Sequence, residues 1–204
     1  MLASRTRITL LTLVVALAFA VAPSAHAGPL VASAHDCPSL AMEQPFVRWL
    51  DPMSYVLQPG GSFESQPDGW DAGSASVSAG NEPWHVHGQD EASSLAIPAG
   101  GSVTGPTMCV GLEHPTLRFF ARSSSRSLST LAVQVIFEDA AGSVHSLPIG
   151  AVAPGGWAPT AAMPIVVNLL PLLPGELTPV RFRFTPVGPA SWQIDDVYVD
   201  PRRQ

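Results

Sequence analysis

The sequence contains no lysine, and charged residues make up 13% of its 204 residues, against about 25% in typical globular domains. Its ten basic residues are all arginines and face 16 acidic residues, so the formal net charge is −6. Nucleic acids and anionic membrane surfaces are bound by basic patches, which an acidic chain with few cations does not offer. Both classes of partner are therefore disfavoured.

Long apolar runs are also scarce. The only one, residues 8–22, follows Arg5 and Arg7 and precedes a small-x-small site that ends at Ala27. This pattern predicts a signal peptide over residues 1–27, with a retained N-terminal anchor as the alternative. No other stretch approaches 18 uninterrupted apolar residues, so we expect no membrane span in the mature chain and a secreted, extracellular location. Cleavage would remove two arginines and no acidic residue, which leaves a net charge of −8.

Catalytic motifs are missing as well. The sequence has no Gly-x-Ser-x-Gly elbow, no His-Glu-x-x-His pair and no phosphate-binding glycine-rich loop. A carboxylate pair for glycoside hydrolysis stays possible, because its spacing is spatial and not sequential. Nothing singles out such a pair, so we expect a protein that is not an enzyme.

Only two cysteines are present, Cys37 and Cys109. In an exported protein two lone cysteines predict one disulfide, since metal ligation would favour a Cys-x-x-Cys spacing. The bond would tie a small, polar and loosely held N-terminal arm, residues 28–44, to a strand near residues 108–112. In the chain-entropy model it contributes up to about 4 kcal/mol.

The mature chain has the pattern of an all-β domain over residues 45–204. Alternation is clearest in residues 131–138 and 180–184, and a turn at residues 139–142 predicts a hairpin. About ten short runs separated by glycine and proline turns, with no helical period, predict an antiparallel β-sandwich of jelly-roll type. Residues 45–50 are expected to form the first strand, and residues 84–87 are expected to be extended.

The closing strand, residues 191–199, breaks its own alternation. Trp192 and Ile194 share one parity while Val197 and Val199 share the other, so a regular strand would turn one apolar pair to solvent. A bulge at Asp195-Asp196 would let both pairs reach the core. It would also direct at least one carboxylate sideways, toward a cation, a capped loop or a ligand.

Three motifs together resemble the galactose-binding-domain-like jelly rolls, which include many carbohydrate-binding modules. They are Gly60-Gly61-Ser62-Phe63-Glu64, then Gly69-Trp70, then Trp192-Gln193-Ile194-Asp195-Asp196-Val197, and the resemblance spans roughly residues 60–200. In that family an early Phe-Glu and a late Asp-Asp-Val meet at a structural calcium. The resemblance implies calcium ligands at Glu64 and Asp196, with Asp195 as the substitute, and hard oxygen donors suit this ion. The alternative is that the aspartates cap a turn.

Candidate ligand-binding residues are the two tryptophans flanked by polar or loop residues, Trp84 and Trp157, which could stack on sugars. Outward-facing Arg118, Gln134 and Arg183 could donate hydrogen bonds to hydroxyls or carboxylates, although such residues also make ordinary solvated faces. The sequence thus predicts a secreted, non-catalytic module that binds a glycan or another cell-envelope or extracellular component. The alternative is a structural or protein-interaction sandwich without a sugar site.

Overall fold

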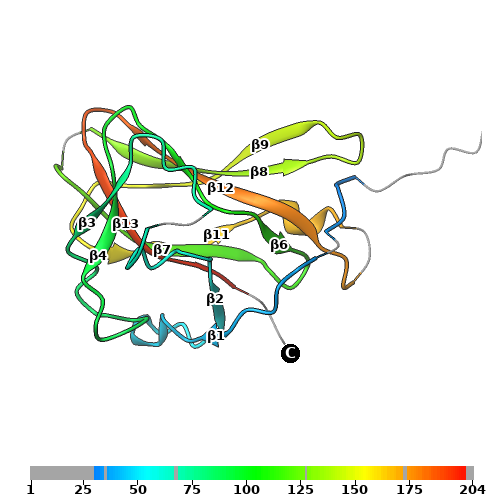
Figure 1. Cartoon of the computed structure of the whole chain (residues 1–204), viewed down its shortest axis with the longest axis horizontal. Helices are drawn as coiled ribbons and strands as arrows, with labels where there is room; N and C mark the ends of the chain where they lie inside the picture. Colours follow the sequence, from blue (N-terminus) through cyan, green and yellow to red (C-terminus); the bar gives the residue numbers. More distant parts are fainter. Residues whose placement is uncertain (1–29, 35, 67–68, 127, 172–173, 201–204) are drawn as a thin grey trace, which may run out of the picture.

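The computed structural model describes residues 30–34, 36–66, 69–126, 128–171 and 174–200, so the predicted signal peptide lies outside the described residues. These described residues form two sheets whose strand pairs are all antiparallel, and the sheets lie face to face (Figure 1). The predicted all-β sandwich is confirmed. Among the described residues, no helix has the length and hydropathy needed to cross a bilayer.

The first sheet is built around the closing strand. It runs in the order β1 (Met42–Glu43), β2 (Tyr55–Leu57), β13 (Trp192–Val199), β4 (Ser93–Ile97), β3 (Ser76–Ala79). β7 (Thr116–Ser123) pairs with β13 and also with β10 (Ala158–Pro159) and β11 (Met163–Pro164).

The second sheet runs β5 (Val103–Thr104), β12 (Thr178–Val187), β8 (Thr130–Glu138), β9 (Val144–Val152), and β6 (Met108–Val110) also pairs with β12. The hairpin predicted at residues 139–142 joins β8 to β9. Its turn is held by Asp139, whose Oδ1 accepts the backbone N–H groups of Ala141 and Ser143. Gly142 supplies a φ of 84°, which a side chain would disfavour.

The core lies between the sheets and follows the predicted alternation. In β8 and β12 every second residue is buried: Leu131, Val133, Val135, Phe137, Val180, Phe182 and Phe184. From the other sheet come Leu117 and Phe119 of β7 and the apolar residues of β13. Burial of this apolar surface from both sheets is the main term that stabilises the fold.

Two segments differ from the sequence prediction. Residues 45–50 are not a strand: Val47–Trp49 is a 3-10 turn, η1, in which Trp49 N–H donates to the carbonyl of Phe46. A second such turn, η2, covers Val167–Leu169. Residues 84–87 lie in a loop between β3 and β4, because side-chain hydrogen bonds curl the backbone there and His85 takes a φ of 50°.

The N-terminal arm is fastened at more than one point. The predicted disulfide between Cys37 and Cys109 is present and connects the arm to β6. Before the disulfide in the chain, Ala32 N–H donates to the Glu138 carbonyl and Ala34 N–H to the Leu177 carbonyl. β1 then adds the end of the arm to β2, so the arm is more tightly held than its composition suggests.

We expect no free thiol when the protein is denatured without reductant and titrated with a thiol reagent. Removing the crosslink by the double substitution Cys37→Ser, Cys109→Ser should lower the free energy of unfolding by about 2–4 kcal/mol, because the unfolded arm regains its freedom. The measurement is a denaturant melt of both forms. Two titratable thiols in the untreated protein would contradict the pairing.

Candidate functional site

The centre of the site is the point where β13 changes its neighbour. On one side, β13 pairs with β4 through Trp192, Gln193 and Ile194 and with β2 through Tyr198 and Val199. The register against β7 shifts between Asp195 and Tyr198, and Asp196 has a φ of 47°. The predicted bulge is confirmed, and both apolar pairs of β13 are at most 1% exposed.

A turn fills the gap that β4 and β2 leave beside the bulge. Gln58 N–H donates to the Val197 carbonyl, and Val197 N–H donates to the carbonyl of Gly61. A Cβ on Gly61 would lie 2.8 Å from the Gln58 carbonyl oxygen and 3.2 Å from that of Val197. Only glycine allows this approach, which places the Gly60–Glu64 segment against the bulge.

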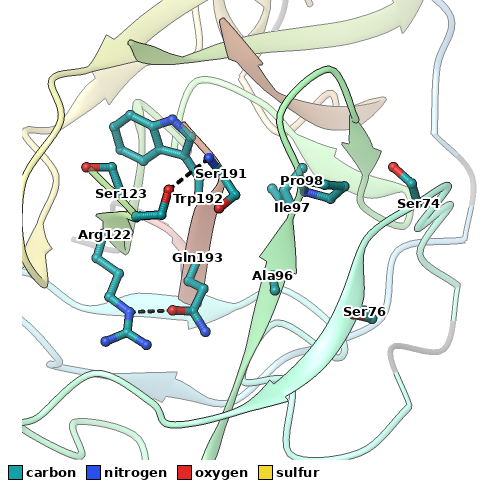
Figure 2. A pocket seen from close by; sticks show the side chains of 11 residues that line it. Ser74, Ser76, Ala96, Ile97, Pro98, Arg122, Ser123, Ser191, Trp192 and Gln193 are labelled. Carbon is teal, nitrogen blue, oxygen red and sulfur yellow. Dashed lines mark hydrogen bonds between the residues drawn. The ribbon is translucent and has the colours of Figure 1, made fainter. Parts of the chain in front are cut away.

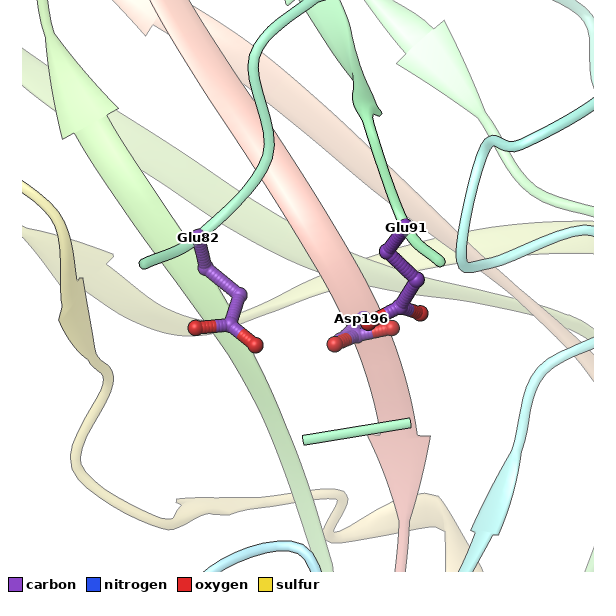
Figure 3. A group of neighbouring side chains, drawn as sticks. All are labelled: Glu82, Glu91 and Asp196. Atoms are coloured by element: carbon purple, nitrogen blue, oxygen red, sulfur yellow. The ribbon is translucent and has the colours of Figure 1, made fainter. Parts of the chain in front are cut away.

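Three carboxylates converge at the bulge (Figure 3). Glu82 and Glu91 come from the two ends of the β3–β4 loop and Asp196 from β13, and one oxygen of each lies within 4.8 Å of the others. All three residues are buried. Neither oxygen of Glu91 or of Asp196 has a hydrogen-bond partner among the described residues. Buried polar atoms are normally satisfied, so four orphaned oxygens in one place require an explanation.

The remaining groups shape the loop around this cluster. Glu82 accepts the backbone N–H groups of Trp84 and Val86, and its own N–H donates to Asp195 Oδ2. Asp195 Oδ1 accepts the N–H of Asp196. Asp195 therefore acts as a backbone acceptor that joins loop to strand, while Asp196 faces the other carboxylates.

Burial and like charge oppose ionisation of the cluster. Burial raises the pKa of Asp195 to about 8, and the charge of Glu91 adds to the effect. The pKa of Asp196 rises to about 10, first through burial and then through the charges of Asp195, Glu91 and Glu82. Burial also raises the pKa of Glu91. Without a counter-charge, Asp196 thus holds a proton at neutral pH.

The donor set fits a hard divalent cation such as calcium, which takes six to eight oxygens. Glu82, Glu91 and Asp196 offer carboxylate oxygens, four of them orphaned, and a cation would satisfy those four. Glu64 lies outside this group of three. Its two oxygens accept the N–H groups of Ala92 and Ser93, so it holds the backbone that follows Glu91.

A second feature is a cleft of about 520 Å³ on the outer face of the first sheet (Figure 2). Its lining residues come from β3, β4, β7, β13 and the adjoining turns: Ser74, Ser76, Ala96, Ile97, Pro98, Arg122, Ser123, Ser124, Ser191, Trp192 and Gln193. Ser76, Ala96, Gln193 and Arg122 are register neighbours and form one row across four strands. Hydroxyls, an amide and a guanidinium therefore face an open cavity.

The rest of this outer face is covered by an aromatic layer, defined here as Phe46, Trp49, Tyr55, Trp84, Phe120, Trp157 and Tyr198. Trp84 and Trp157 are both half-buried in it. The ring of Trp84 lies edge-on to Trp49, with centroids 5.0 Å apart, and the ring of Trp157 lies 5.1 Å from the guanidinium carbon of Arg122. Trp157 thus stands beside the cleft.

The predicted ligand-binding residues divide between two faces. Arg118 shares the outer face with the tryptophans, but it is buried, pairs with Asp51 and lies over the ring of Phe46. Gln134 and Arg183 are register partners on the second sheet, with side chains on its outward parity, and Arg183 Nε donates to Thr104 Oγ1. Trp157 lies on the outer face of the first sheet, and Gln134 and Arg183 lie on the outer face of the second. A single ligand site therefore cannot include residues from both groups.

Four residues of these two sites were not predicted from the sequence: Glu82, Glu91, Arg122 and Gln193. Glu82 and Glu91 lie in a loop more than a hundred residues from Asp196, and no local pattern links them to it. Arg122 has the same outward parity in its strand as Arg118. Only the tertiary structure shows that Arg118 is covered and Arg122 is open.

No protein-family model matches the sequence, and no significant match is found among curated proteins. The structure is similar to the CBM22-1 and GH10 modules of endo-1,4-beta-D-xylanase 10B from Clostridium thermocellum, solved with xylohexaose. The TM-score is 0.51 at 15% identity, over 70% of this chain and 28% of that chain.

Two other similar structures are carbohydrate-binding modules. A CBM22-1 xylan-binding domain from Paenibacillus barcinonensis is 14% identical over 71% of this chain and 93% of its own, with a TM-score of 0.45. TmCBM61, solved with beta-1,4-galactotriose, is 16% identical over 70% and 95% of the two chains, with a TM-score of 0.39. At 15% identity the likeness to the xylanase structure concerns the fold alone, and it confirms the jelly-roll fold expected from the sequence.

We expect the metal-free protein to lose stability as the pH rises from 5 to 9. Asp195 and Asp196 have folded-state pKa values above the ordinary 3.8, so the native state binds more protons than the unfolded state across this range. The free energy of unfolding must then fall with rising pH. Thermal melts in chelator at several pH values check this. Asp196→Asn should flatten the pH dependence of the melting midpoint. Asp90→Asn, at an exposed position of the β3–β4 loop, is the control and should leave that dependence unchanged. A wild-type midpoint that climbs from pH 5 to 9 would contradict it.

Proposed function

We propose that this protein is a secreted, non-catalytic module that binds a glycan in the cleft on the outer face of the first sheet. The observation that carries the proposal is the cleft itself, a cavity of about 520 Å³ lined by serine hydroxyls, Gln193 and Arg122. Sugars present alternating hydroxyls and apolar ring faces, so they need convergent hydrogen-bonding groups beside an aromatic ring. Trp157 provides such a ring next to Arg122.

The polar groups of the cleft are held in place before any ligand arrives. Arg122 Nε donates to Gln193 Oε1, and Gln193 Nε2 donates to Ser94 Oγ at 3.3 Å. Ser94 Oγ in turn donates to the Gly80 carbonyl at 2.6 Å. Preorganised groups lose less conformational entropy when they bind, which favours recognition. The structure solved with xylohexaose has a similar fold, which agrees with this function.

The disulfide and the predicted signal peptide support an extracellular location, because disulfides persist in oxidising compartments. We also propose calcium as a structural cofactor at Glu82, Glu91 and Asp196. The ion would neutralise the repulsion between these carboxylates and hold the β3–β4 loop, which carries Trp84, against β13.

The glycan proposal predicts that mature protein binds at least one polysaccharide in a panel that includes xylan, galactan, cellulose and acidic polymers. The double substitution Trp157→Ala, Gln193→Ala should weaken that binding at least about tenfold, since it removes the ring and the central amide and since tenfold is about 1.4 kcal/mol. Affinity electrophoresis or calorimetry measures it. The matched control is Gln134→Ala, Arg183→Ala on the opposite sheet.

Two results would overturn the location of the site. The first is loss of binding in the control pair with retention in the cleft pair, which would move the site to the second sheet. The second is absence of binding to every polymer, which would favour the alternative of a structural or protein-interaction module.

The calcium proposal predicts that the ion raises the melting midpoint at pH 8. At a hundredfold excess over its dissociation constant, a ligand held only by the folded state adds about 2.7 kcal/mol, which is about 5–10 °C for a chain of this size. Glu91→Gln should abolish this response. Glu64→Gln tests the ligand expected from the sequence: a normal response in this variant removes Glu64 from the ligand set, and a midpoint that calcium leaves unchanged in wild type rejects the metal.

A further inference from the structure

Arg122 is the only charged residue among the residues that line the cleft in the described part of the chain. The protein as a whole carries 16 acidic and ten basic residues, yet no carboxylate of a described residue lines this cavity. The remaining lining groups are neutral hydroxyls, one amide and apolar side chains. The candidate sugar site is therefore locally positive on an acidic protein.

The guanidinium of Arg122 has no counter-charge within the described residues. Arg118, four positions earlier and on the same face of β7, forms a salt bridge with Asp51, but no salt bridge from Arg122 to a described residue is present. Its Nε donates to Gln193. The Nη1 and Nη2 atoms, which carry four N–H groups, donate to no other described residue.

The same contacts fix the orientation of Arg122. Gln193 holds Nε, and the ring of Trp157 lies against the guanidinium at 5.1 Å. Because the contacts with Gln193 and Trp157 involve one edge and one face of the guanidinium, its Nη1 and Nη2 N–H groups can donate to a ligand. A planar carboxylate is the partner that these N–H groups match, through two parallel N–H···O bonds.

We propose that the cleft selects glycans that carry a carboxylate, as uronic-acid residues do, and that Arg122 is the residue that binds it. The inference rests on the proposed glycan-binding function and specifies its substrate class. Non-specific adsorption of a polyanion to a protein of net charge −6 is unfavourable. Binding of an acidic polymer would therefore be due to the cleft and not to the net charge of the protein.

The experiment compares each acidic polymer with its own carboxyl-reduced form, so that only the charge differs. Suitable probes are glucuronoxylan, polygalacturonate and alginate, titrated by calorimetry against the mature protein. We expect at least one native polymer to bind at least about tenfold more tightly than its reduced form, which is about 1.4 kcal/mol. Arg122→Gln should remove that difference, so that the native and reduced forms bind with equal affinity.

Three further variants separate the role of Arg122 from general effects. Arg122→Lys keeps the positive charge but lacks the two-pronged guanidinium, so it should retain part of the preference for the native polymer that Arg122→Gln loses. Ser76→Glu keeps Arg122 and adds a carboxylate to the cleft, so it should weaken the acidic polymer selectively. Arg183→Gln on the opposite sheet is the matched control and should change nothing. Melting curves of all variants verify that they fold.

The possible failures are distinguishable. If native and reduced polymers bind equally, the charge selectivity is rejected while glycan binding stands. If the preference survives in Arg122→Gln, or if dextran sulfate binds as tightly as the uronic-acid polymers, recognition of a carboxylate by Arg122 is rejected. If no polymer binds in either form, the proposed function is rejected along with this inference.

Discussion

The bulge in β13 is the constraint on which the rest of the structure depends. β13 lies at the centre of its sheet and must bury Trp192 and Ile194 on one side of the irregularity and Val197 and Val199 on the other. It meets this demand by inserting one extra residue where its neighbour changes from β4 to β2. The apolar core therefore forces a polar residue, Asp196, into a gap between strands, and the acidic cluster is a consequence of how the core is closed.

The same irregularity organises the outer face of the sheet. The β3–β4 loop must fold over the bulge, because the Glu82 N–H donates to Asp195 and the Glu82 carboxylate accepts from Trp84 and Val86. This brings the ring of Trp84 against the ring of Phe120 in the aromatic layer. Beyond that layer the sheet stays open. The outer face therefore has a packed part, in which Arg118 forms a salt bridge with Asp51, and a cleft, in which Arg122 forms no salt bridge with a described residue.

Much of the fold was predictable because β-sandwich cores repeat with a period of two. The alternation in residues 131–138 and 180–184 marks strands that pair along their whole length, and the two cysteines could form only one intramolecular pair. The prediction was wrong where local hydrogen bonds outweigh pattern. Residues 45–50 look like a strand, but their backbone closes a 3-10 turn and their Phe46 ring packs onto the sheet from outside.

By itself the sequence determined the fold class, the disulfide and the existence of a bulge at Asp195-Asp196, since each follows from burial or chemistry within a short segment. Only the tertiary structure decided that Glu82 and Glu91 accompany Asp196 and that Arg122, unlike Arg118, opens into a cleft. The physical reason is that these arrangements depend on which loop covers which part of a sheet. That choice is made by contacts between segments far apart in the chain, and no local periodicity encodes it.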